Sequence, residues 1–141
     1  MYKIAVIIMA LFTISGCSSL NENVKVFLGY STAQVDESRK DALVKIFDCD
    51  RDTCYMNAEN ILKKVSKASV YVKNKDMIAL YYINPDTTPV GIFFTSVDAA
   101  HTKVEVSSPS RNAKEVIAKC VFTNSDKAAG EASVKAVAKI H

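Results

Sequence analysis

The chain has 141 residues, with four cysteines, two histidines and no tryptophan, and its net charge is only +3. This length predicts one domain, and so weak a positive charge gives no support for nucleic-acid binding. After residue 17 the sequence contains no apolar run of about 20 residues, the length that a membrane-spanning helix requires.

Residues 1–17, MYKIAVIIMALFTISGC, have the pattern of a secretory leader. Lys3 precedes an apolar run over 4–12, which is too short to cross a bilayer but suits a signal peptide. The leader closes with ISGC at 14–17, which resembles the lipobox of bacterial lipoproteins, with isoleucine where leucine is usual. The alternatives are an ordinary secretory signal with an incidental cysteine, or an uncleaved anchor.

The lipobox resemblance implies that residues 1–16 are removed and that Cys17 carries acyl chains such as palmitate. The partner at this end is then membrane lipid, with 17–23 as a short tether. Ser18 stands where an aspartate commonly signals inner-membrane retention, so the resemblance implies the outer membrane, facing the periplasm, in a Gram-negative cell. In a Gram-positive cell the anchor would lie in the cytoplasmic membrane.

The folded body is expected over residues 24–123. Alternating apolar residues in VKVFLGY, 24–30, predict a strand, and the polar segment 31–40 has the composition of a loop. Apolar residues at helical spacing predict a short helix over 38–47. A stronger stripe predicts a second helix over 53–65.

Four strands are expected after this helix, as two hairpins. The first hairpin joins 68–73 to 77–83, and the second joins 89–97 to 102–108, because each run alternates and each is bounded by turn residues. Ser108-Pro109-Ser110 then marks the start of an amphipathic helix. The Ala- and Lys-rich segment 124–141 is expected to be a C-terminal tail or a marginal helix.

This order of elements predicts an α+β fold, with an antiparallel sheet of about five strands and two or three helices packed on one face. Residues 89–122 also resemble the C-terminal half of small uncharacterised α+β lipoprotein domains of bacteria, which combine a hairpin, a KVEVSS-type strand end and a docking helix. That resemblance implies no particular activity.

The segment FDCDRDTCYMNAE, 47–59, offers the strongest candidate chemistry. Asp48, Asp50, Asp52 and Glu59 have the spacing of a calcium loop, but Thr53 occupies the position where an EF-hand needs glycine. The sequence therefore predicts no metal site and keeps these four acids as a weak calcium candidate. The simpler interpretation is that Asp52 or Thr53 caps the following helix.

Cys49 and Cys54 can form a disulfide only if the helix breaks between them, because bridged Cα atoms lie within about 7 Å. Asp50-Arg51-Asp52 supplies such a break, and an exported protein meets an oxidising compartment. Free, packed thiols and a bridge from one of them to Cys120 remain open, with Cys120 expected in the core. A redox-active pair is disfavoured by the C-x4-C spacing and the neighbouring acids.

No other group of residues predicts catalysis or a cofactor. His101 lies near Asp98 and Ser96, but neighbours on one tight turn seldom hold the geometry of a catalytic triad. The aromatic residues on the strands are expected to pack against one another. The sequence thus predicts a lipid-anchored, non-enzymatic envelope protein that binds another envelope component; the alternative is a periplasmic thiol-redox or calcium-binding module using residues 48–59.

Overall fold

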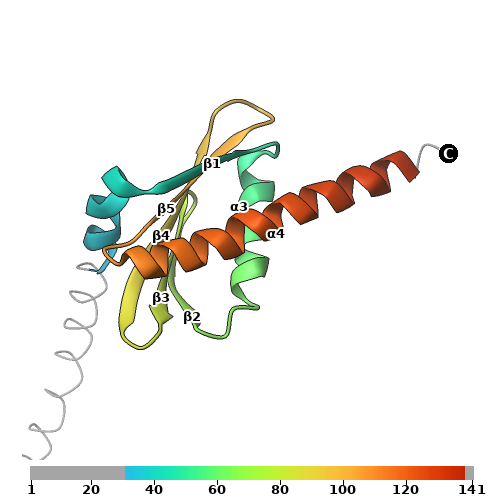
Figure 1. The fold of residues 1–141 in the computed structure, drawn as a ribbon. Helices are drawn as coiled ribbons and strands as arrows, with labels where there is room; N and C mark the ends of the chain where they lie inside the picture. Colours follow the sequence, from blue (N-terminus) through green and yellow to red (C-terminus); the bar gives the residue numbers. More distant parts are fainter. Residues whose placement is uncertain (1–30, 139–141) are drawn as a thin grey trace, which may run out of the picture. The chain divides into compact units, whose positions relative to one another are not determined.

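The computed structural model describes residues 31–138, and the side chains of residues 31–127 (Figure 1). The expected strand 24–30 and Cys17 lie outside the described residues. Within them, residues 31–37 are helical and lead into the 3-10 helix η1. The elements that follow are η1 (Ser38–Asp41), β1 (Leu43–Phe47), α3 (Arg51–Leu62), β2 (Ala68–Lys73), β3 (Met77–Ile83), β4 (Thr87–Ser96), β5 (Thr102–Ser107) and α4 (Arg111–Ala138).

The strands form one antiparallel sheet in the order β1-β5-β4-β3-β2. Both predicted hairpins are present, as β2–β3 and β4–β5, and the α+β class with a sheet of five strands is confirmed. The sequence assigned the fifth strand to residues 24–30, whereas in the described structure β1 pairs with β5, with Leu43 opposite Val106.

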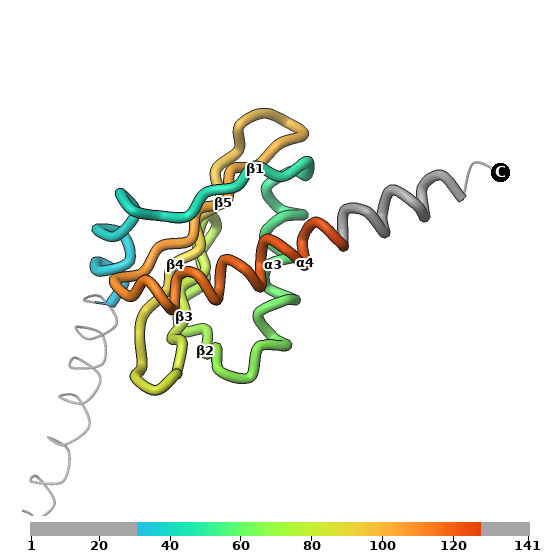
Figure 2. Tube along the Cα trace, viewed as in Figure 1, coloured from blue at the N-terminus to red at the C-terminus, as the bar shows by residue number. Residues whose placement is uncertain are grey.

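The main core lies on the face of the sheet that α3 and α4 cover, called here the helical face. Figure 2 shows α4 crossing α3 on this side, and the two helices are in contact. The side chains that fill this core alternate along the strands and recur along the helices, as amphipathic elements require. They include Ile78, Leu80, Val90, Ile92, Phe94, Val104 and Val106 from the sheet, and Ala58, Leu62, Ile117 and Val121 from the helices.

A smaller cluster covers the opposite face, where the helical residues 32–37 lie. Val35 is fully buried there with Met77, Ala79 and Phe93. Gly91 makes the close approach possible, because an added Cβ would lie 2.8 Å from the Phe93 ring and 3.0 Å from Val35. The helical elements therefore occupy both faces of the sheet, with α3 and α4 on one and residues 32–37 on the other.

Two predictions for residues 31–47 are wrong. The expected loop 31–40 is helical over 31–37 and η1. Buried Val35, the Ser107 hydroxyl that donates to the Val35 carbonyl at 2.6 Å, and the ion pair of Arg39 with Glu105 join this segment to the sheet. The expected helix 38–47 is instead η1 followed by strand β1. The apolar residues of this segment fit the period of a helix as well as that of a strand, because some are adjacent and others are three positions apart. Pairing with β5 favours the strand.

The two long helices are close to their predicted positions. The helix expected over 53–65 is α3, which begins two residues earlier and ends three residues earlier. α4 begins at Arg111, after Ser110, whose hydroxyl accepts a hydrogen bond from the Ala113 N–H at 3.3 Å. The helix then continues past residue 124 to Ala138 without interruption. No helix in the described part of the chain is long and apolar enough to cross a membrane.

Candidate functional site

The disulfide is the most distinctive feature at the start of α3. Cys49 and Cys54 are bonded, with Cα atoms 5.9 Å apart. Cys49 precedes the helix and Cys54 lies in its first turn, so the predicted break in the helix is present. Cys54 is only 5% exposed and packs into the main core. Of the alternatives that the sequence left open, the Cys49–Cys54 bridge is therefore the one that forms.

Asp50, enclosed in the disulfide loop, caps α3. Its carboxylate accepts hydrogen bonds from the Thr53 N–H at 2.9 Å and from the Thr53 hydroxyl at 2.7 Å. The hydroxyl contact, followed by the backbone contact, lowers the pKa of Asp50 from its ordinary value. The predicted caps, Asp52 and Thr53, are thus replaced by Asp50. Asp52 is within the helix, and its side chain is 84% exposed.

The acids of the weak calcium candidate do not converge. Asp50 is occupied in the cap, and Asp48 lies 3.4 Å from the His101 ring nitrogen Nε2. Glu59 accepts a hydrogen bond from Lys73 Nζ at 2.7 Å, and this contact lowers its pKa. Within residues 31–127, no three His, Cys, Asp or Glu side chains are grouped so that they could hold a metal ion.

The turn between β4 and β5 is joined to the disulfide segment. His101 Nδ1 contacts both Asp98 carboxylate oxygens, at 2.7 and 2.8 Å, and its Nε2 faces Asp48. The hydrogen bond to Asp98, the negative charge of Asp98 and that of Asp48 together raise the pKa of His101. The Thr102 hydroxyl donates to the Cys49 carbonyl at 2.8 Å. These contacts hold the end of β1 against the start of β5.

The turn between β2 and β3 approaches the same helix end. Arg51 Nη1 donates to Asp76 at 2.8 Å, so this guanidinium joins the start of α3 to the β2–β3 turn. The sequence did not predict the contacts made by Asp76, His101 and Thr102. Three of these contacts, Arg51–Asp76, Asp48–His101 and Cys49–Thr102, join residues 25 to 53 positions apart, and local sequence patterns carry no signal for pairs at such separations. The contact between Asp98 and His101 is local, over three positions.

Cys120 is the free thiol of the described chain and is partly buried. Cys120 lines a groove of about 580 Å³ between α3 and α4. The sequence predicts this residue in the core, but it is not a member of the main core cluster. The strand aromatics pack as predicted. Tyr71 and Tyr81 stack at 4.2 Å on the opposite face, and Phe94 meets Tyr55 of α3 at 5.0 Å on the helical face.

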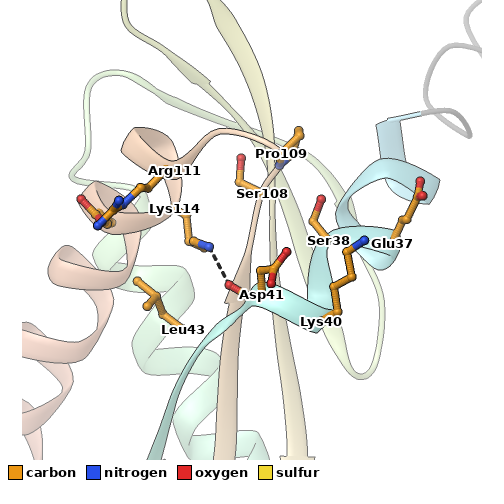
Figure 3. A pocket seen from close by; sticks show the side chains of 10 residues that line it. Glu37, Ser38, Lys40, Asp41, Leu43, Ser108, Pro109, Arg111 and Lys114 are labelled. Atoms are coloured by element: carbon orange, nitrogen blue, oxygen red, sulfur yellow. Dashed lines mark hydrogen bonds and ion pairs between the residues drawn. The ribbon is translucent and has the colours of Figure 1, made fainter.

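A cavity of about 560 Å³ lies between η1 and the start of α4 (Figure 3). Lys114 reaches across it and donates to the Asp41 carbonyl at 2.6 Å, while Arg111 pairs with Glu115 at 2.8 Å. Its lining carries equal numbers of basic and acidic side chains, so the net charge favours neither anions nor cations. The lining residues are Glu37, Ser38, Lys40, Asp41, Leu43, Ser108, Pro109, Arg111, Lys114 and Glu115.

No protein-family model matches the chain, and no curated protein matches it either.

Proposed function

We propose that the protein is a lipid-anchored component of the bacterial cell envelope, with a non-catalytic α+β body that binds another envelope component. The observation that carries this proposal is ISGC at 14–17, which closes a leader with one early lysine and a short apolar run. The Cys49–Cys54 disulfide supports export, because such bonds persist mainly in oxidising compartments outside the cytosol.

The way the body uses its titratable groups favours binding over catalysis. Asp50 caps a helix, Glu59 pairs with Lys73, and His101 holds two loops together through Asp98 and Asp48. Each of these groups has a structural partner, and structural ion pairs and caps of this kind account for its shifted pKa without a catalytic role. The balanced charge around the cavity beside η1 likewise gives no focused field for a charged substrate.

The anchor would hold the body close to its membrane. Two or more acyl chains make attachment stable, because each buried methylene contributes about 0.8 kcal/mol and one chain alone is marginal. The proposed tether, residues 18–23, spans at most about 20 Å when fully extended. With serine at position 18, the outer membrane facing the periplasm is the proposed location in a Gram-negative cell.

Intact mass spectrometry of the native protein, with cell fractionation, tests this proposal. We expect the loss of residues 1–16 and a mass increase on Cys17 that corresponds to two or three acyl chains. Cys17→Ala should abolish this increase and release the protein from membranes, whereas the matched control Cys120→Ala should leave both unchanged. An unmodified Cys17 still joined to its leader would refute the anchor and remove the main support for an envelope role.

A thiol-redox module is the second candidate, favoured by the position of Cys54 in the first turn of α3, where a helix stabilises a thiolate. Titration with glutathione buffers separates the two candidates. A redox module predicts reversible opening near the potential of the compartment, with a reactive thiol of low pKa. A structural bond predicts resistance to glutathione, in keeping with the burial of Cys54.

A further inference from the structure

β1 forms one end of the sheet, and its outer edge has no strand partner among the described residues. It pairs with β5 alone, so half of its backbone N–H and C=O groups face away from the sheet. Edge strands of this kind pair readily with other chains unless they are protected by proline, by free charges or by a covering segment.

β1 is covered on the helical face of the sheet and exposed on the opposite face. On the helical face α4 covers it, with the Phe47 and Phe122 rings 5.8 Å apart and Lys45 paired with Asp126. On the opposite face Val44 and Ile46 are 53% and 55% exposed. The strand contains no proline, and its lysine is engaged in the ion pair with Asp126.

The other exposed large apolar residues do not form such a feature. Met56 lies on α3, Val70 on the other edge strand β2, Ile83 at the end of β3 and Val97 in the β4–β5 turn. Each is a single side chain, and scattered residues of this kind are ordinary on a protein surface. Among the residues that the structure describes, Val44 and Ile46 are the two that alternate along one strand with an open edge.

We propose that the β1 edge is a self-association surface, on which β1 of a second copy of this chain pairs antiparallel about a two-fold axis beside Lys45. In this register Val44 of each copy lies opposite Ile46 of the other copy. The four apolar side chains then form one continuous patch on the opposite face, and the two sheets join into one.

The charges next to the two-fold axis on one copy are complementary to the same charges on the second copy. The axis places the two Lys45 residues opposite each other on the helical face, and each is accompanied by its Asp126. Two lysines and two aspartates therefore meet at the centre, and each aspartate neutralises a lysine that would otherwise face a like charge. A surface that carries both members of an ion pair beside a two-fold axis matches itself, which favours a second copy over an unrelated partner.

This argument uses the described body alone and does not depend on the lipid anchor. If the proposed function also holds, anchoring confines the copies to one membrane plane and raises their effective concentration. The two proposals fail separately, because the mass of the N-terminus reports the anchor and the oligomeric state reports the edge.

Sedimentation of the full-length protein in detergent tests the edge. We expect a dimer that Val44→Lys or Ile46→Lys weakens by about tenfold, since a charge replaces an apolar cross-strand contact twice in each dimer. Val97→Lys is the matched control, because Val97 is also 55% exposed but lies in a turn, and it should leave the dimer intact. Melting curves of all variants should show that the fold is retained.

Crosslinking in native membranes tests the register. In a Cys120→Ala background, Lys45→Cys places two thiols across the axis, so mild oxidation should give a covalent dimer, and Val97→Cys should not. A wild-type protein that stays monomeric both in detergent and in membranes would overturn the proposal. So would a dimer that persists in both lysine variants, or an edge that captures an unrelated protein while the chain itself remains monomeric.

Discussion

Breaking the Cys49–Cys54 bond should destabilise the body by an amount that the structure allows us to calculate. The bonded residues are separated by 5 positions in the sequence, so the closed loop is short. The loop-entropy relation then gives about 2 kcal/mol at 25 °C, near the lower end of the usual range for disulfides. For a domain of this size, such a loss corresponds to a fall in melting temperature of about 6–10 °C.

Two perturbations separate the bond from the packing of its sulfur atoms. Reduction removes the bond and leaves both sulfur atoms in place, so it should cost only the loop-entropy contribution. The Cys49→Ala/Cys54→Ala double variant also removes the buried Cys54 sulfur from the main core, and it should lose about 1 kcal/mol more. The Thr102 hydroxyl contact survives both changes, because its acceptor is the backbone carbonyl of residue 49.

Thermal unfolding followed by circular dichroism, with and without reductant, measures both effects. Cys120→Ala serves as the control, since Cys120 is free and its variant should retain the full sensitivity to reductant. The double variant should be insensitive to reductant. If the wild-type protein melted within about 1 °C with and without reductant, while mass analysis confirmed that the bond was open, the unfolded-state argument would be refuted.

Two further predictions concern the same end of the sheet. Asp50→Ala should lower the free energy of unfolding by about 1 kcal/mol in chemical denaturation, because it removes the cap of α3. Asp52→Ala, at an exposed helix position, should change that free energy by less than about 0.5 kcal/mol. Equal effects of the two substitutions would contradict the cap assignment. The pKa of His101 is raised in the folded state, so its contribution to stability is present below its unfolded pKa of about 6.5 and is lost as pH rises through the folded value. His101→Gln should therefore reduce stability at pH 6 more than at pH 9, and an NMR titration that placed the His101 pKa below 6.5 would exclude this mechanism.

The fold class and both hairpins could be predicted because their signals are local. Residues 68–83 and 89–108 alternate over whole strands and are separated by turn residues, so strand period and pairing point to the same arrangement. The start of α4 could be predicted to within two residues. The sequence favours Ser108 as the cap and Pro109 as the first helical residue, whereas the helix begins at Arg111 and Ser110 caps it.

The site was less predictable, because its geometry depends on contacts that are distant in sequence. The Cys49–Cys54 bridge was one of three open alternatives, and only the position of the helix start decided between them. The sequence does offer Asp50 as a cap, because aspartate is among the preferred N-cap residues, but it does not distinguish Asp50 from Asp52. The acids drew attention as a metal loop, whereas in the structure each has a different partner.

The wrong prediction of a helix at β1 and the proposed self-association have the same physical origin, which is the apolar composition of this strand. LVKIF carries four apolar residues in five positions, so it lacks the alternation expected of a strand with one face in water. Leu43 and Phe47 pack on the main core beneath α4, which accounts for half of that apolar content. Val44 and Ile46 are 53% and 55% exposed and belong to neither of the two described core clusters. A strand that is apolar on both faces is typical of a strand covered on both faces, and a second copy paired at the β1 edge would supply the missing cover.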